Sequence, residues 1–237
     1  MAITEAIVQY RRFLKRRNCS ANTVKNYMHT LRQFVLWVDV PIESVTGKKI
    51  LQYIDHLRAR RLQPKTINCH LDSIRGFYNY LREEEDLRII NPVKRNYNLR
   101  LPRPLPRYLK DEEVPRLFSQ IKSCRDRAIF MLMLRCGLRV EEVANLSLRA
   151  IDAKRRRIVV ENGKGAKDRL VYISDDALTA LGAYLRTRPP SRAKKVFLVD
   201  KGRYRGKPIS VRGIQKRMEH YAQKTGLKVS CHQLRHT

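Results

Sequence analysis

Two helices are predicted to meet at Cys136-Gly-Leu-Arg-Val-Glu-Glu-Val-Ala-Asn-Leu146. The residues before this stretch, Ala128-Ile-Phe-Met-Leu-Met-Leu134, are all apolar and predict a buried helix. Apolar residues then recur at helical spacing from Val140 onward, which predicts a second helix. Gly137 is the expected break between them, because glycine tolerates the left-handed conformation that ends a helix.

Arg139 lies at this predicted bend, close to the start of the second helix. Such a position suits an anion, because the first N–H groups of a helix point outward and carry the positive end of its dipole. The arginine is therefore either a site residue or a structural clamp that pairs with Glu142. This segment alone leaves both interpretations open.

The charge of the chain points to a polyanionic partner. Lys and Arg number 51 against 22 Asp and Glu, a net charge of +29 on 237 residues. The excess is spread over the chain, with +10 on residues 1–100 and +19 on residues 101–237. Charge runs are often only solvated surface, but an excess of this size favours nucleic acid, and both halves are expected to contact it.

The composition predicts a folded protein of one or two domains, since 43% of the residues are hydrophobic. The five cysteines are isolated from one another, without the spacing of zinc sites or a disulfide framework, and predict reduced thiols in a cytoplasmic protein. No apolar run approaches the roughly 20 residues of a membrane span. We expect no membrane contact, no metal and no cofactor.

Residues 1–90 are predicted to form the first domain, a small helical bundle. Its four helical segments begin near Thr4, Ser20, Thr46 and Gln63, and Thr4 is expected to cap the first. The exposed faces are expected to hold basic residues that suit contacts to a duplex backbone. These are Lys25, Arg32, Lys48, Lys49, Lys65 and Arg75.

Residues 91–108 are predicted to be a linker, because four prolines within them disfavour a helix. Basic residues alternate with these prolines, among them Arg103 and Arg107. They suggest that the linker follows a phosphate backbone, although a solvated linker would show the same composition.

Residues 109–237 are predicted to form an α+β domain with a small antiparallel β-sheet, so that the protein is mainly α. The strings Arg157–Val160 and Arg169–Ile173 are joined by Glu161-Asn-Gly-Lys-Gly-Ala-Lys-Asp168, which predicts a β-hairpin. Glycines on both sides of Lys164 would let its ammonium approach a ligand, but the pattern by itself favours a plain surface turn. Lys167 lies in the same turn. A basic loop further along carries Arg203 and Arg205, also expected to contact DNA.

The last residues, Ser230-Cys-His-Gln-Leu-Arg-His-Thr237, place His232 and Arg235 three positions apart. On a helix such residues share a face. A guanidinium can bind two phosphate oxygens, and an imidazole can donate a hydrogen bond or transfer a proton. The pair is therefore suited to an anionic phosphate.

Taken together, these residues resemble the tyrosine recombinase family (phage integrases and Xer-like recombinases) over nearly the whole chain. The matching motifs of the first domain are Ser20–Tyr27 and Thr66–Leu81. Those that follow are Asn91-Pro, Leu105-Pro, Gly137-Leu-Arg-Val-Glu-Glu, Gly163–Arg169 and His232–Thr237. The resemblance implies a helical core-binding domain, a catalytic domain, and a homotetramer on paired sites in double-stranded DNA.

The resemblance also implies the role of each site residue. Arg139 and Arg235 would clamp the scissile phosphate, with Glu142 as the acid that supports Arg139. Lys164 would protonate the leaving 5′ oxygen, with Lys167 as the alternative, and His232 would assist. Two prearranged guanidiniums stabilise the negative charge that develops in the transition state, without a metal.

One feature departs from the family pattern. The family's second His or Trp and its nucleophilic Tyr follow the His-x-x-Arg motif, whereas all eleven tyrosines here precede His232. We therefore expect a fragment of a site-specific recombinase that lacks its nucleophile. The alternative is a naturally shortened DNA-binding or regulatory relative without catalytic activity.

Overall fold

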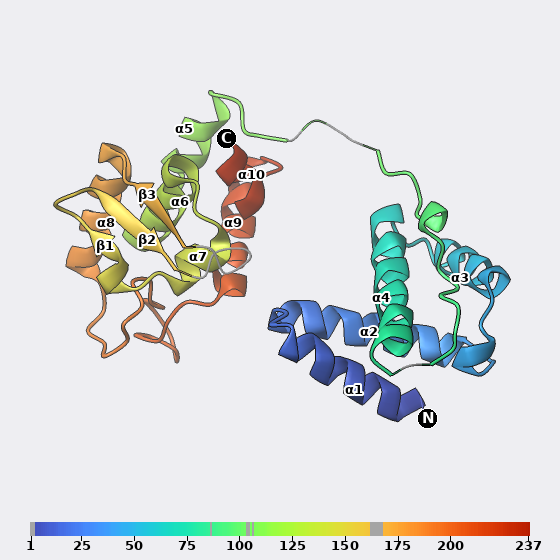
Figure 1. Cartoon of the computed structure of the whole chain (residues 1–237). Helices are drawn as coiled ribbons and strands as arrows, with labels where there is room; N and C mark the ends of the chain where they lie inside the picture. Colours follow the sequence, from blue (N-terminus) through green and yellow to red (C-terminus); the bar gives the residue numbers. More distant parts are fainter. Residues whose placement is uncertain (1–2, 86, 103–104, 106, 162–167) are drawn as a thin grey trace. The chain divides into compact units, whose positions relative to one another are not determined.

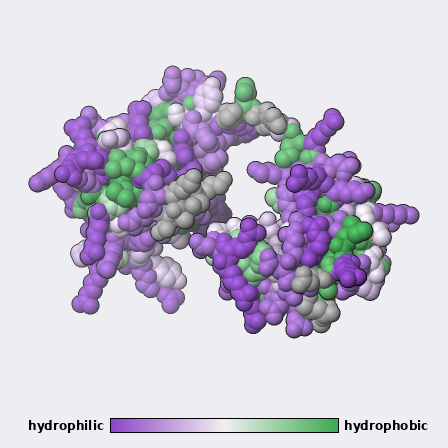
Figure 2. Space-filling model, in the orientation of Figure 1, coloured by the Kyte–Doolittle hydropathy of each residue, from purple (hydrophilic) through white to green (hydrophobic). Residues whose placement is uncertain are grey.

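The chain folds into two compact units, Met1–Arg103 and Pro104–Thr237. The computed structural model describes residues 3–85, 87–102, 105, 107–161 and 168–237, and each unit is considered by itself (Figure 1). Hydrophilic side chains cover most of the visible face of each unit (Figure 2). No helix among the described residues is long and apolar enough to cross a membrane.

The first unit is a bundle of four helices, α1 (Ile3–Arg16), α2 (Ala21–Trp37), α3 (Gly47–Ala59) and α4 (Pro64–Glu83). Ser20 and Thr46 cap α2 and α3 through their hydroxyls, as the sequence predicted. Thr4 differs from the prediction, because α1 already begins at Ile3 and Thr4 lies inside its first turn. The core of the bundle is rich in aromatic rings, with Tyr10, Phe34 and Phe77 among those almost fully buried.

The segment after α4 folds back onto the bundle. The side chain of Asn91 donates hydrogen bonds to the carbonyl of Arg75 and to Asn79, and Val93 is buried in the bundle core. Further along, the amide of Asn68 binds both backbone groups of Leu99 at 2.8 and 2.9 Å. Residues 91–99, predicted as the first half of a linker, therefore pack against α4.

In the described residues of the second unit, six α-helices and a small sheet pack around one core. The helices are α5 (Glu113–Ser119), α6 (Cys124–Cys136), α7 (Val140–Asn145), α8 (Asp175–Thr187), α9 (Val211–Thr225) and α10 (Cys231–His236). The antiparallel sheet has the order β1 (Ile151–Asp152), β2 (Arg157–Val160) and β3 (Arg169–Tyr172). Ile158 of β2, Phe130 of α6 and Leu181 of α8 meet in the core.

The bend between α6 and α7 confirms the prediction from the sequence. Gly137 has φ +60° and ends α6 in the left-handed conformation. Arg139 is the residue that precedes α7. The turn thereby places its side chain at the surface while Leu138 and Val143 on either side are fully buried.

Candidate active site

Arg139 is held by a carboxylate that also binds a second arginine. Glu142 Oε1 lies 2.8 Å from Nη1 of Arg139 and 2.6 Å from Nη1 of Arg169, and its Oε2 accepts the Arg139 backbone N–H at 2.6 Å. Arg169 Nη2 adds a fourth bond at 2.8 Å to Oε2. Glu142 is thus both the capping acid of α7 and the bridge from α7 to β3.

The electrostatics of Glu142 follow from this position. Burial by itself would raise the pKa of Glu142, since its side chain is only 7% exposed. The hydrogen bonds from Arg169 and from the backbone and side chain of Arg139 outweigh burial and lower the pKa to about 2. The cluster therefore holds one negative and two positive charges at neutral pH, with one positive charge in excess.

The short helix α10 supplies the other predicted pair. Ser230 and Gln233 form a reciprocal capping box at its start. His232 is exposed, and its Nε2 lies 3.0 Å from Nε2 of His236. Arg235 is half-buried, and its pKa is lowered first by this burial and then by the positive charges of Arg139 and Arg169. The structure therefore brings Arg235 close to the Arg139 cluster.

Arg139, His232 and Arg235 line one groove of about 480 Å³. Its other walls come from the start of α7, one face of α9 and the segment before α10. Two acids also lie along it, Glu141 and Glu219, of which Glu219 pairs with Arg212 at 2.8 Å. Two guanidiniums and an imidazole that face a shared space can bind an anion with several oxygens.

The β-hairpin is confirmed, with Val160 opposite Arg169 at the end of the strands next to the turn. Lys164 and Lys167 lie outside the described residues. Arg169, five positions after Lys164 in the sequence, is the residue of this hairpin that contacts Glu142. Arg169 was not predicted as a site residue, although it belongs to the motif Gly163–Arg169.

Most residues predicted to contact DNA are exposed where the structure describes them. These are Lys25, Arg32, Lys48, Lys65, Arg107, Arg203 and Arg205, while Arg103 lies outside the described residues. Lys49 pairs with Asp39 and lies over the ring of Trp37. Arg75 differs from the prediction, because its guanidinium binds Asp72, Asn98 and the carbonyls of Val93 and Lys94. Its visible role is to hold the segment after α4.

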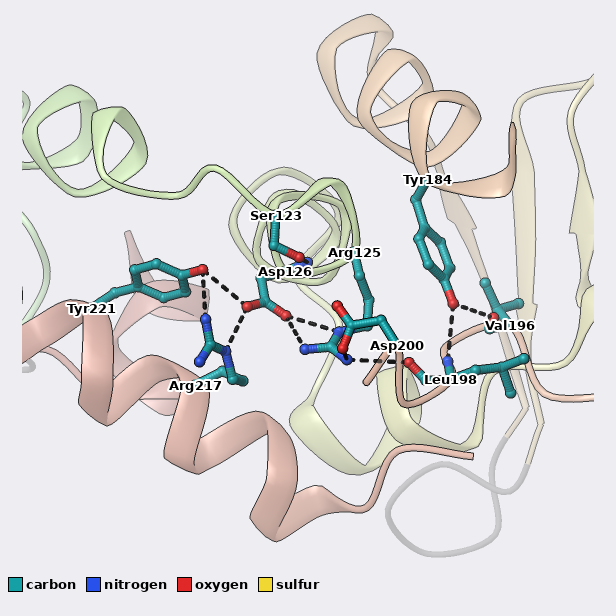
Figure 3. Close-up of polar contacts among 9 residues, drawn as sticks. All are labelled: Ser123, Arg125, Asp126, Tyr184, Val196, Leu198, Asp200, Arg217 and Tyr221. Carbon is teal, nitrogen blue, oxygen red and sulfur yellow. Dashed lines mark hydrogen bonds and ion pairs between the residues drawn. The ribbon is translucent and has the colours of Figure 1, made fainter. Parts of the chain in front are cut away.

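A buried polar network, absent from the sequence analysis, lies elsewhere in the second unit (Figure 3). Asp126 is fully buried and binds Arg125 at 2.7 Å, Arg217 at 2.6 Å and the hydroxyl of Tyr221 at 3.0 Å. Arg125 continues the network to Asp200 at 2.6 Å. It ties the start of α6 to α9 and to the segment around Asp200.

Among the residues that the structure describes, no group of His, Cys, Asp or Glu side chains could hold a metal ion. The basic side chains that line the groove come instead from the start of α7, with Arg139, and from α10, with His232 and Arg235. Their arrangement is suited to binding an oxyanion directly.

Comparison with protein families identifies the class of protein. Residues 107–237 match the phage integrase family, and residues 7–86 match the N-terminal SAM-like domain of phage integrases. The chain belongs to the phage integrase family, the tyrosine recombinases.

Similar tyrosine recombinases are matched by this chain over most of their length. Tyrosine recombinase XerA of Thermococcus kodakarensis is 32% identical, with 98% of this chain and 79% of the relative covered. Tyrosine recombinase XerC of Thermodesulfovibrio yellowstonii is 31% identical, with 92% of this chain and 75% of the relative covered.

Solved structures show the same fold. A lambda integrase dimer bound to a COC′ core site matches with a TM-score of 0.77 at 17% identity, over 99% of this chain and 84% of that chain. The Tn1549 transposon integrase in complex with circular intermediate DNA matches with a TM-score of 0.77 at 18% identity, over 98% and 84%. Both confirm the predicted tyrosine recombinase fold, mainly helical with a small antiparallel sheet.

Proposed function

We propose that this protein acts in site-specific recombination of double-stranded DNA, cleaving and rejoining strands through a 3′-phosphotyrosine intermediate. The observation that carries the proposal is that Arg139 and Arg235 line one groove. Family membership supports the same activity. The groove is proposed to bind the scissile phosphate.

The two arginines stabilise the charge that develops on the non-bridging oxygens of that phosphate. Their positions are fixed before the reaction, so they interact most strongly with the transition state, where this charge is largest. Glu142 and Arg169 are positioning residues in this proposal. Glu142 binds the Arg139 guanidinium, and Arg169 holds the Glu142 carboxylate in place.

Two further groups handle the proton and the orientation of the phosphate. Lys164 is proposed to protonate the leaving 5′ oxygen, with Lys167 as the alternative in the same turn. His232, at the edge of the groove, is proposed to hydrogen-bond a phosphate oxygen or transfer a proton.

The nucleophile is not assigned to any of the eleven tyrosines. No tyrosine is among the described residues that line the groove, and six of the eleven are buried in the cores of the two units. The proposal therefore takes the nucleophilic hydroxyl from outside these 237 residues. Attack would require that hydroxyl in line with the leaving oxygen, roughly 3 to 3.5 Å from phosphorus.

Duplex DNA is the proposed partner of both units. The exposed cations of α2, α3 and α4 and those of the loop before α9 would bind phosphates, with Arg75 left out because it is engaged within the bundle. Among proteins of this fold, a lambda integrase tetramer is bound to a Holliday junction. We propose that this protein likewise acts as a homotetramer on paired sites.

The experiment uses the protein translated from the complete gene and a library of duplexes with random sequence. Covalent protein–DNA adducts are trapped, separated on a denaturing gel and sequenced. Arg139→Ala and Arg235→Ala are expected to abolish the adduct while duplex affinity stays within about threefold, because each removes one or two of many phosphate contacts. Arg135→Ala, which removes an exposed arginine paired with Asp176, is the matched control and should leave the adduct intact.

If no adduct forms with the unsubstituted protein, the non-catalytic DNA-binding alternative is favoured. The 237-residue chain is tested alongside it. An adduct on this shorter chain would show that one of its eleven tyrosines is the nucleophile, against the proposal.

A further inference from the structure

The loop from Lys201 to Lys207, which precedes α9, combines four cations with one aromatic ring (orange-red in Figure 1). Lys201, Arg203, Arg205 and Lys207 are all exposed, and among the described residues none is in an ion pair. The acid next to the loop, Asp200, binds the buried Arg125 instead. Tyr204 lies in the middle of the loop and is 57% exposed.

The loop has a defined backbone. The Val199 N–H donates to the Lys207 carbonyl, and the Gly206 N–H donates to the Val199 carbonyl, both at 2.8 Å. Gly202 and Gly206 have φ of +76° and +78°, which lets the chain turn sharply on both sides of Tyr204. The Ser191 hydroxyl also donates to the Gly206 carbonyl at 2.7 Å.

The buried network fixes the root of the loop (Figure 3). The Tyr184 hydroxyl accepts the Leu198 N–H at 2.9 Å, and Arg125 donates to the Leu198 carbonyl and to Asp200. Arg125 is itself bound to the fully buried Asp126. These contacts therefore anchor the exposed loop to the core of the second unit at Leu198 and Asp200, just before the loop begins.

Tyr204 is held among the cations of its own loop. The Arg203 guanidinium carbon lies 6.0 Å and the Lys207 Nζ 5.5 Å from the centre of its ring. Cations near a ring are attracted to its π face, which orients the phenol but leaves more than half of it in water. An ordered loop that exposes a ring between cations presents an uncharged surface and phosphate-binding groups to the same ligand.

Building on the proposed function, we propose that Tyr204 enters a groove of the DNA duplex and packs against base pairs while the neighbouring cations bind the flanking phosphates. Aromatic side chains that stack on bases add to affinity whatever the base, since every base has a π face. Side chains that wedge between base steps also unstack them locally. Tyr204 would thereby favour sequences whose base steps open easily.

The experiment separates this contribution from the phosphate contacts. Duplex affinity of the full chain is measured by fluorescence anisotropy at several salt concentrations for the unsubstituted protein, Tyr204→Ala, Tyr204→Phe and Arg203→Ala. Tyr204→Ala is expected to weaken binding about tenfold without changing the slope of log affinity against log salt, because the ring carries no charge. Arg203→Ala is expected to reduce the slope by about 0.9, the value for one phosphate contact. Tyr204→Phe, which keeps the ring, should bind within about twofold of the unsubstituted protein.

Tyr172→Ala is the matched control, since Tyr172 is 71% exposed but lies on β3 at the end of the hairpin away from the turn. It should leave affinity and slope unchanged. Duplexes with 2-aminopurine at successive positions give a second readout, an increase of fluorescence where a base is unstacked, which Tyr204→Ala should abolish.

Three results would overturn the inference. In the first, Tyr204→Ala binds DNA as tightly as the unsubstituted protein. In the second, Tyr204→Ala lowers the salt slope as Arg203→Ala does, which would mean that the ring only positions the cations. Equal losses in Tyr204→Ala and Tyr172→Ala would also contradict it. A flat salt response of the unsubstituted protein is a different failure, because it would remove the proposed DNA-binding function itself.

Discussion

Glu142 and Asp126 are each bound by two arginines, and the cluster around Glu142 lies beside the groove that Arg139 lines. The side chains of Arg139 and Arg169 are 38% and 32% exposed. In the other cluster, that of Arg125 is 7% exposed, that of Arg217 is 35% exposed, and Asp126 is fully buried. Both clusters carry one positive charge in excess. In the buried network this charge is directed to Asp200, while at the groove it remains available to an anion.

The comparison shows that an acid between two arginines can serve two purposes. Around Asp126 each arginine has a second partner within the protein, Asp200 for Arg125 and the Tyr221 hydroxyl for Arg217, so the cluster joins elements of the fold. When one guanidinium keeps an open side, the same acid fixes it in place for a ligand. Substitutions around Asp126 should therefore mainly lower stability, whereas substitutions around Glu142 should mainly lower activity.

Asp126→Ala should have the largest effect on stability. Removing one partner of a buried ion pair leaves uncompensated charge in the interior and typically destabilises by about 3–5 kcal/mol. Urea unfolding followed by far-UV circular dichroism measures the loss. Fluorescence of Trp37, the single tryptophan, reports on the first unit and should keep its midpoint. An unchanged circular dichroism transition would mean that the network does not stabilise the second unit.

Glu142→Gln should destabilise less and impair activity more. A glutamine can still accept a hydrogen bond, but it no longer compensates the charges of Arg139 and Arg169. We expect a loss of about 2 kcal/mol at pH 7 and at least a tenfold loss of the covalent adduct in the experiment proposed above. A variant that loses stability but keeps full adduct formation would assign Glu142 to the fold alone.

The same substitution has a defined pH dependence. The pKa of Glu142 is lowered from 4.5 to about 2 in the folded protein, so its contribution to stability is fully present above the unfolded value. The contribution is lost as the pH falls from about 4.5 towards 2. Unfolding free energies of the unsubstituted protein and Glu142→Gln should therefore converge over this range. A constant difference between them would contradict the ion-pair account.

The smallest effect is expected from the surface pair of Arg135 and Asp176. The two side chains are 53% and 38% exposed and lie 2.7 Å apart. Exposed pairs contribute roughly 0–1 kcal/mol and are screened by salt. A double-mutant cycle with Arg135→Ala and Asp176→Ala should give a coupling energy below about 0.5 kcal/mol that vanishes in 1 M salt. A coupling as large as that of a buried pair would mean that exposure does not distinguish the clusters.

Local features of the fold were predictable from the sequence because they depend on neighbouring residues. Gly137 ends a helix, Ser20 and Thr46 cap helices, and β2 pairs with β3 as antiparallel strands. Arg139 and Glu142 are three positions apart, so their pairing also followed from helical spacing.

Contacts between distant residues could not be predicted in this way. Arg169 binds Glu142 across 27 positions, and Arg217 binds Asp126 across 91. His70 is buried and its Nδ1 lies 2.9 Å from the hydroxyl of Tyr53, 17 positions away. One signal was available, since Arg125 and Asp126 are adjacent charges at the start of an apolar helix, where unpaired charge would be costly.

The wall of the groove contains a cysteine, Cys231, whose reaction with thiol reagents can report on the opening of α10. Cys231, the first residue of α10, is 6% exposed, and burial raises the pKa of its thiol to about 11. Thiol reagents attack the thiolate, so Cys231 reacts only during the intervals when α10 detaches and the thiol reaches water. Cys69 and Cys124 are exposed and label first. The labelling rate of Cys231 then measures how often α10 opens. An anion that bridges Arg139 and Arg235 should lower this rate.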